Sequence, residues 1–292
     1  MKYGSHIALV AMVALNASAR DAQAHQQGSP PLTALVTRFA SWTAVTGYER
    51  AVTDSLLTLF PDATRDRAGN VVMTLGRGTP KRLLSCPLDE MGWVVGNVTD
   101  DGYLTLRRVG RARSPLFDQQ LEGHRVTLFG RRGPVPGVVG VHSTHLLRER
   151  TASDEPFSVD SAFVDVGATS RSEALDLGVE VLTPVALTKA PHPYGNGLLA
   201  APVAGRRAAC AALAAAVLAK PKVKGTVIAA FTVQSLVRPD VGISSLKNLM
   251  GPVDTAVVVS VPVKFAETAV ETVAMADVDS VRTKLVAWME GK

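Results

Sequence analysis

LLSCPLDEMGWVV, residues 83–95, contains the pattern that decides the fold. The apolar run that ends at Cys86 predicts a strand, and the carboxylate pair Asp89-Glu90 follows it directly. A second β-rich run begins at Trp93. Because open α/β sheets form their sites at the carboxyl ends of strands, Asp89-Glu90 is a candidate site, although an exposed turn would give the same local sequence.

Helical and strand-like segments alternate on both sides of this stretch, which is typical of an α/β domain. Apolar residues at helical spacing predict the helices, and an Ala-rich one is expected to be buried on all sides. Near-continuous apolar runs predict central strands that are covered on both faces. The expected helices are 32–42, 49–60, 206–220 and a last one from Asp277, ended by Gly291; the expected central strands are 226–233 and 255–261.

Residues 100–188 differ from the segments around them. Gly, Pro and Arg are frequent, the strand-like runs are short, and only residues 170–177 have helical spacing. This texture predicts a small β-barrel or sandwich inserted into the chain. The expected organisation is therefore an α/β domain, residues 32–99 and 189–292, interrupted by a β domain, residues 100–188.

Composition places the chain among globular proteins. Of its 292 residues 47% are hydrophobic and 20% are charged, which excludes a disordered chain. The net charge of +5 does not by itself indicate nucleic acid. A basic cluster has no interleaved aromatic residues, so we expect a solvated face with at most weak contact to an anionic membrane surface or an acidic partner. Its members are Arg107, Arg108, Arg111 and Arg113.

The N-terminus has the pattern of a secretory signal. Lys2 precedes an apolar run of ten residues, 6–15, and the small-residue sites 17–19 (ASA) and 22–24 (AQA) follow it. The run is shorter than the roughly 20 residues that span a bilayer, which disfavours an uncleaved anchor. The Pro-containing stretch after it disfavours an ordinary first helix. We therefore expect a signal peptide over residues 1–24, a linker over 25–31, and an exported protein, periplasmic or extracellular.

Motifs for familiar chemistry are missing. No G-x-S-x-G, G-x-G-x-x-G or H-E-x-x-H occurs in the sequence. His142 and His145 lie three residues apart but have no third ligand, so plain polar surface is favoured over a metal site. In an oxidising compartment Cys86 and Cys210 would either pair or remain two separately buried thiols.

The order of landmarks resembles the dinuclear-metal aminopeptidases of metallopeptidase family 42, which include tetrahedral, deblocking and glutamyl aminopeptidases. This resemblance implies a peptidase-like α/β/α domain interrupted by a small inserted β-barrel. The matching stretches run in family order over nearly the whole chain after the signal: 46–49 (TGYE), 68–71 (AGNV), 83–95, 100–110 (DDGYLTLRRVG), 144–147 (THLL), 163–179 (FVDVGATSRSEALDLGV), 207–210 (RAAC), 229–234 (AAFTVQ) and 270–281 (VETVAMADVDSV).

The positions that the resemblance assigns to metal ligands and to the general base are substituted. The substituted positions are Pro87 for the first histidine ligand, Gly205 for the bridging aspartate, Ser235 for the general base, Leu236 for a glutamate ligand, Ser260 for an aspartate ligand and Glu267 for the last histidine. Asp89 is kept, but its family task is to orient the missing histidine. We therefore expect no catalytic residue, no metal and no cofactor.

Two functions compete. The first is an exported non-catalytic homologue that acts as a structural, accessory or binding subunit through protein–protein contacts. The alternative is an active metal-dependent aminopeptidase-like hydrolase with a degenerate site, relocated to Asp89, Glu90 and Glu267 or to the histidines of the insertion. Adjacent carboxylates on an extended segment point to opposite faces, which disfavours a site that needs both.

The family segment between Ser260 and Glu267 is shortened here to six residues. The resemblance implies that several strands and helices which cover the sheet are missing. The last helix, 277–290, would cover the exposed face, or else the surface near Val257, Val259, Val261 and Phe265 would meet another protein chain or a second copy.

The signal predicts that the exported protein begins after Ala19 or Ala24, because each alanine ends an A-x-A site. N-terminal sequencing of the exported material measures this directly. An intact Met1 on that material would contradict the prediction and favour the anchor.

Overall fold

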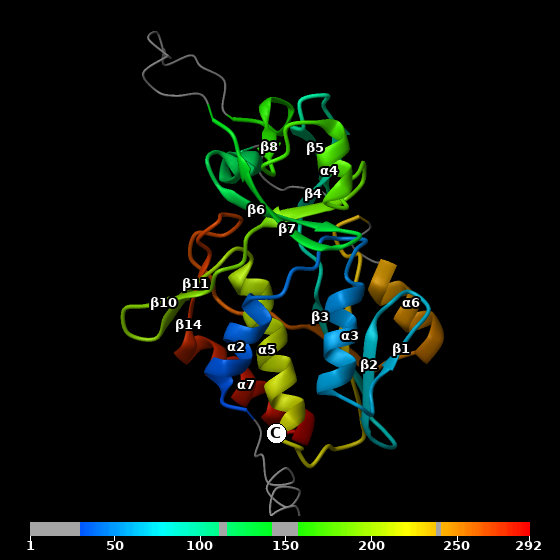
Figure 1. The fold of residues 1–292 in the computed structure, drawn as a ribbon. Coiled ribbons are helices and arrows are strands. Elements are labelled where there is room, and N and C mark those ends of the chain that lie inside the picture. Colours follow the sequence, from blue (N-terminus) through cyan, green and yellow to red (C-terminus); the bar gives the residue numbers. More distant parts are fainter. Residues whose placement is uncertain (1–29, 111–115, 142–156, 238–240) are drawn as a thin grey trace, which may run out of the picture.

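The computed structural model describes residues 30–110, 116–141, 157–237 and 241–292 (Figure 1). The signal segment, His142, His145 and the arginines at 111 and 113 lie outside these ranges, so the expectations about them stay predictions. Within the described ranges, no helix has the length and apolar character needed to cross a membrane.

A closed β-barrel forms the inserted domain, at the top of Figure 1, as expected. Its core contains the buried side chains of Trp93, Leu106, Leu128 and Val164. β4 belongs to this barrel, although the boundary drawn at residue 100 assigned its sequence to the α/β part. An apolar strand has the same sequence pattern in a barrel as in an α/β sheet, so the sequence could not assign β4 to one of them. In the structure, Trp93 and Val95 belong to the barrel core. The strands in barrel order are β4 (Gly92–Val98), β5 (Leu104–Val109), β8 (Phe163–Asp165), β7 (Gly133–Val139), β6 (Arg125–Gly130) and β9 (Pro184–Leu187).

Three short helices accompany the barrel. Ser170 caps α4 (Arg171–Asp176) by accepting from the backbone N–H of Glu173, which agrees with the helix expected at 170–177. The two 3₁₀ turns η1 (Phe117–Leu121) and η2 (Val159–Ser161) have no counterpart in the sequence analysis.

A five-stranded sheet forms the centre of the α/β domain. β3 pairs in parallel with β12 and with β13, whereas β2 runs antiparallel to β12. Helices cover both faces, so the expected α/β/α arrangement is confirmed. The strand order is β1 (Thr64–Arg65), β2 (Val71–Gly76), β12 (Thr226–Thr232), β3 (Lys81–Pro87) and β13 (Thr255–Val258). One face of the sheet shares a core with α2 (Leu32–Ala40), α3 (Arg50–Leu59), α5 (Ala204–Leu218) and α7 (Met275–Glu290). The other face packs against α6 (Val241–Met250).

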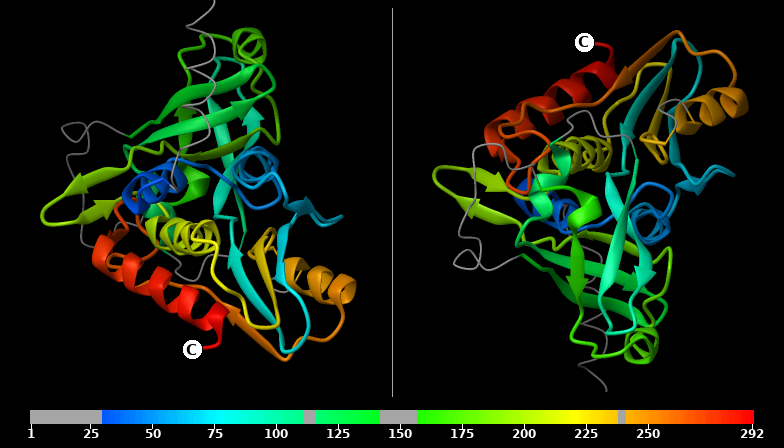
Figure 2. Two further views of the ribbon diagram at one scale, coloured as in Figure 1. Left: turned by 90° about the horizontal axis from the view of Figure 1, so that it is seen from below. Right: turned by 90° about the horizontal axis from the view of Figure 1, so that it is seen from above.

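Helix α5 lies at the centre of the larger core, between α2, α7 and the sheet (Figures 1 and 2). Its sequence, AGRRAACAALAAAVL, is rich in alanine, and almost every residue is buried, as expected. Small side chains let neighbouring elements approach closely without leaving voids. The two arginines near its start are its only charged residues, and both point to the site described below.

Strand β13 differs from its expected role as a central strand. It is the edge strand of the sheet, and the side chain of Val258 is 56% exposed. Helix α7 lies against one face, where Val257 is half-buried and Val259 is buried, whereas Phe265 further along the chain is exposed. An apolar run cannot show how many neighbours a strand has, because these come from distant parts of the chain.

A three-stranded sheet that the sequence analysis did not predict leads into the last helix. Its strands are too short for a periodic signal. Helix α7 begins two residues before Asp277, with Ala274 as the N-cap, and Gly291 ends it at φ +77° as expected. The strands are β10 (His192–Tyr194), β11 (Leu198–Ala200) and β14 (Thr272–Ala274).

A disulfide joins Cys86 at the end of β3 to Cys210 in α5. This decides between the two alternatives that the sequence left open. Both residues are fully buried, so the bond ties the sheet to its central helix directly below the candidate site.

The disulfide closes a loop with a sequence separation of 124 residues, so its removal is expected to lower the free energy of unfolding by about 2–5 kcal/mol. The Cys86→Ala/Cys210→Ala variant, compared with the natural chain by urea unfolding, measures this. Cys210→Ala alone should lose a similar amount, because either change breaks the bond. An unchanged urea midpoint in both variants would contradict the prediction.

Candidate functional site

The carboxylate pair after β3 is buried and is not an exposed turn. The residue exposures of Asp89 and Glu90 are 0% and 1%. Leu88 still follows the sheet, since its N–H donates to Thr232 O, and the two carboxylates that follow have entirely separate partners. The expectation that they point apart is therefore confirmed, and each must be considered with its own neighbours.

Asp89 is held by groups of the chain that follows β12. Its Oδ1 accepts from Ser235 Oγ at 2.6 Å, and its Oδ2 accepts from the N–H of Leu236 at 2.9 Å. Arg206 Nη1 lies 3.5 Å from Oδ1 and donates to Ser235 Oγ at 2.9 Å. Both oxygens of Asp89 are thus engaged, and a guanidinium supplies the opposite charge.

Glu90 is held by two buried cations. Lys189 Nζ bonds to Oε2, and Arg207 Nη2 lies 3.1 Å from Oε1, which also accepts from the N–H of Ala44 at 2.8 Å. Lys189 comes from the segment that leaves the barrel, Arg207 from α5 and Ala44 from the loop after α2. A single carboxylate therefore connects three distant parts of the chain.

Burial and charge pairing have opposite effects on the pKa values of the groups in this cluster. Burial alone would raise the pKa of Glu90, but Lys189 and Arg207 lower it below its ordinary value. Burial lowers the pKa of Lys189, and the attraction of Glu90 opposes that decrease. Burial also lowers the pKa of Arg206, with Asp89 acting in the opposite direction. The cations and carboxylates therefore form one coupled network.

A third carboxylate binds the first turn of α5. Glu271 Oε2 accepts from the N–H of Gly205 at 3.0 Å, and its Oε1 accepts from the N–H of Glu267 at 2.8 Å. A negative charge at the start of a helix is favourable. A Cβ at Gly205 would meet Val263 at 3.2 Å, so the short segment after β13 closes over this position.

Glu49 lies beside the same loop. Its Oε1 accepts from the N–H of Gln234 at 2.8 Å. Burial raises the pKa of Glu49, and the charge of Asp89 acts in the same direction, although hydrogen bonds from the backbone oppose the change. Glu49 thus helps to hold the turn from which Ser235 and Leu236 reach Asp89.

A cavity of about 240 Å³ opens between the barrel and the α/β domain above this cluster. The barrel contributes Trp93 and Phe117 to its wall, and the α/β domain contributes Arg206 and Leu236. Charged groups of both signs face it. They are Glu90, Lys189, Arg206, Glu267 and Glu271.

The structure brings most of the sequence-predicted positions together. Asp89, Ser235 and Leu236 are in contact, and Gly205, Leu236, Glu90 and Glu267 line the cavity. Ser260 lies elsewhere, in a groove beside α7. No motif in the sequence indicated Lys189, Arg206 or Glu271. The adjacent arginines in an otherwise apolar helix were the one available signal, because buried charges are almost always paired.

The residues present do not fit the dinuclear metal centre of the resembled family. The side chains of Pro87, Gly205 and Leu236 carry no donor atom. Both oxygens of Asp89 already have partners within the chain. In the described ranges, no group of three or more His, Cys, Asp and Glu side chains is arranged to hold a metal ion.

Comparisons with known proteins agree with the resemblance. SgcX of Escherichia coli (strain K12), a proposed aminopeptidase, is 34% identical to this chain over 177 residues. The matched region is 58% of this chain and 46% of SgcX. Lysyl aminopeptidase of Pyrococcus furiosus is 32% identical over 144 residues, 48% of this chain and 40% of that protein. The chain therefore spans less than half the length of these curated relatives.

Solved structures share the fold over most of the described chain. The TET1 peptidase of Pyrococcus horikoshii, which can assemble into a tetrahedron or a large octahedral shell, has a TM-score of 0.77 at 22% identity and covers 89% of this chain and 99% of its own. Aminopeptidase APDkam598 of Desulfurococcus kamchatkensis has a TM-score of 0.75 at 19% identity, and the match covers 89% of this chain and 95% of that protein's chain.

The family model described as M42 glutamyl aminopeptidase matches residues 69–280, which include β3, the whole barrel and the candidate site except Ala44 and Glu49. Since this match covers more than half of the sequence, the chain belongs to the M42 glutamyl aminopeptidase family.

Proposed function

We propose that this chain is a non-catalytic member of the M42 family that acts as an exported structural or binding subunit. One observation carries the proposal: Asp89, the family carboxylate that remains, is bonded to Ser235, Leu236 and Arg206 of the same chain. A catalytic zinc site needs about three protein ligands and an open position. Here the guanidinium of Arg206 lies beside Asp89.

The remaining carboxylates have a structural role in this proposal. Glu90 joins α5, the loop after α2 and the exit from the barrel, and Glu271 joins α5 to the segment before β14. The cavity above them stays as a binding site, bounded by both domains.

Export and self-association complete the proposal. The Cys86–Cys210 disulfide supports export, because disulfides persist in oxidising compartments. The assembly of the TET1 peptidase supports self-association as the form of protein contact.

The proposal predicts that the purified full chain holds no stoichiometric zinc or cobalt and does not cleave aminoacyl substrates when either metal is added. Elemental analysis and an aminoacyl-p-nitroanilide assay on the same sample measure both properties. The proposal would be contradicted by one bound metal ion per chain together with hydrolysis that is abolished by Asp89→Asn and by Glu267→Gln. That result would establish the hydrolase with a relocated site.

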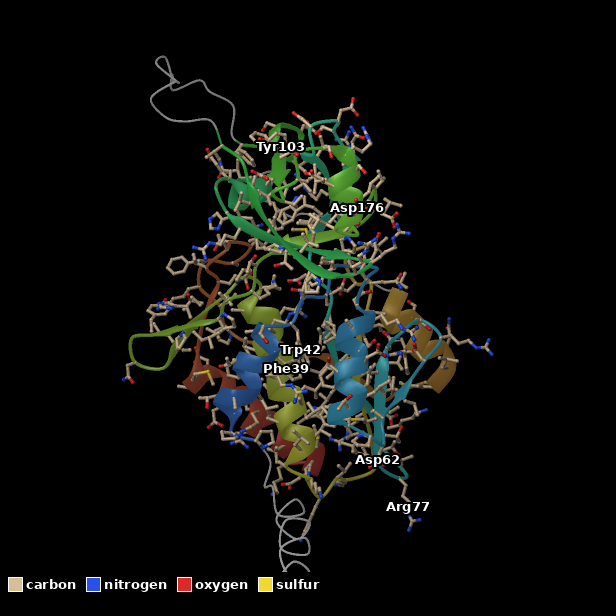
Figure 3. The ribbon with its side chains drawn as sticks, viewed as in Figure 1. Phe39, Trp42, Asp62, Arg77, Tyr103 and Asp176 are labelled. Atoms are coloured by element: carbon tan, nitrogen blue, oxygen red, sulfur yellow. A yellow bond between two sulfur atoms is a disulfide. The ribbon has the colours of Figure 1, made fainter. Side chains whose placement is uncertain are left out.

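The structural role of Glu90 predicts that Glu90→Gln lowers the free energy of unfolding by about 3–5 kcal/mol, because two buried cations lose their partner. Urea unfolding measures the change. Asp62→Asn is the matched control, since Asp62 lies on the surface (Figure 3) and its change should stay within about 0.5 kcal/mol.

The same variant has a pH dependence of known sign. The pKa of Glu90 is lowered in the folded state, so its stabilisation is present above the unfolded value of 4.5 and is lost as the pH falls through the folded value. The difference between the natural chain and Glu90→Gln should therefore shrink in acid. An equal difference at neutral and acid pH would contradict the assignment.

A further inference from the structure

The outer edge of β13 is an open strand edge. Among the described strands, only β3 pairs with β13, and the strand order of the sheet ends there. Natural sheets protect such edges with charged residues, proline or bulges. Residues 255–259, TAVVV, contain no charge and no proline, and the side chain of Val258 is 56% exposed. Nothing in this strand discourages pairing with another strand.

A groove of about 270 Å³ lies between this strand and α7. Its floor is apolar and includes Val257, Val259 and Leu285. Trp288 forms part of its wall, and the guanidinium of Arg82 lies 4.6 Å from the centre of that ring. The apolar surface of the groove therefore continues from the edge of β13 onto α7.

Side chains of opposite charge lie before the first residue of β13 and in the groove beside its second half. Asp254 precedes β13 and is exposed, and its carboxylate accepts from the N–H of Lys81 at 2.7 Å. Lys284 of α7 lines the groove together with Val257–Ser260, which form the second half of this segment. In the described part of the chain, neither Asp254 nor Lys284 has an ion-pair partner within 4.0 Å.

We propose that a second copy of this chain docks here, with the two β13 strands antiparallel about a twofold axis. Antiparallel pairing places the start of one strand beside the end of the other, so Asp254 of each copy approaches Lys284 of its partner. The same patch then serves both copies, as in most closed dimers. A parallel pairing would instead place like charges together. The five-stranded sheet of each copy would continue across the interface.

The inference rests on the self-association included in the proposed function, and it names the surface and symmetry. Its test measures mass and not hydrolysis, so the two proposals fail separately. The full chain is examined by sedimentation velocity over a concentration series. Lys284→Asp and Asp254→Lys should each weaken the dimer at least tenfold, and the charge-swapped double variant should regain most of that loss.

Two further variants complete the design. Val258→Lys places a charge on the open edge and should yield a monomer. Arg77→Glu is the control for charge reversal. Arg77 is exposed directly after β2 (Figure 3), a strand that β12 and β3 separate from β13, so this variant should leave the dimer unchanged. A monomeric natural chain would overturn the proposal, as would a dimer that none of the groove variants weakens.

Discussion

The carboxylates of Asp89 and Glu90 lie fully buried where the sheet, the central helix and the barrel meet. An unpaired buried charge costs several kcal/mol, so each carboxylate has to be matched before these parts can pack together. Arg206 and Arg207 at the start of α5 supply one cation to each, and Lys189 supplies a second to Glu90. The position of α5, the exit from the barrel and the loop after β12 all depend on this pairing.

The rest of the domain is arranged around the same helix. The alanine-rich body of α5 lets α2, α7 and the sheet close on it, and the Cys86–Cys210 disulfide connects it to β3 below the charged cluster. Glu271 then binds its first turn and holds the shortened segment after β13 over Gly205. The charged residues of this region thus join separate elements of one chain.

The α/β domain and its barrel could be predicted from the sequence, because apolar periodicity is a local property of each segment. The pair Asp89-Glu90 could be located for the same reason. Lys189 and Glu271 could not, since their roles arise from contacts with residues 99 and 66 positions away. The exposure of β13 could not be predicted either, because its apolar residues resemble those of the buried β12 and only the strand order distinguishes the two strands.

The central claim is that internal charge pairs replace the metal centre in this chain. It is tested most directly by anomalous diffraction at the zinc absorption edge, measured on crystals of the full chain soaked in zinc. We predict that no anomalous peak lies within bonding distance of Asp89 and that Arg206 remains beside it, bonded to Ser235. A peak bound by Asp89 together with Glu267 or Glu271, with Arg206 displaced, would contradict the account.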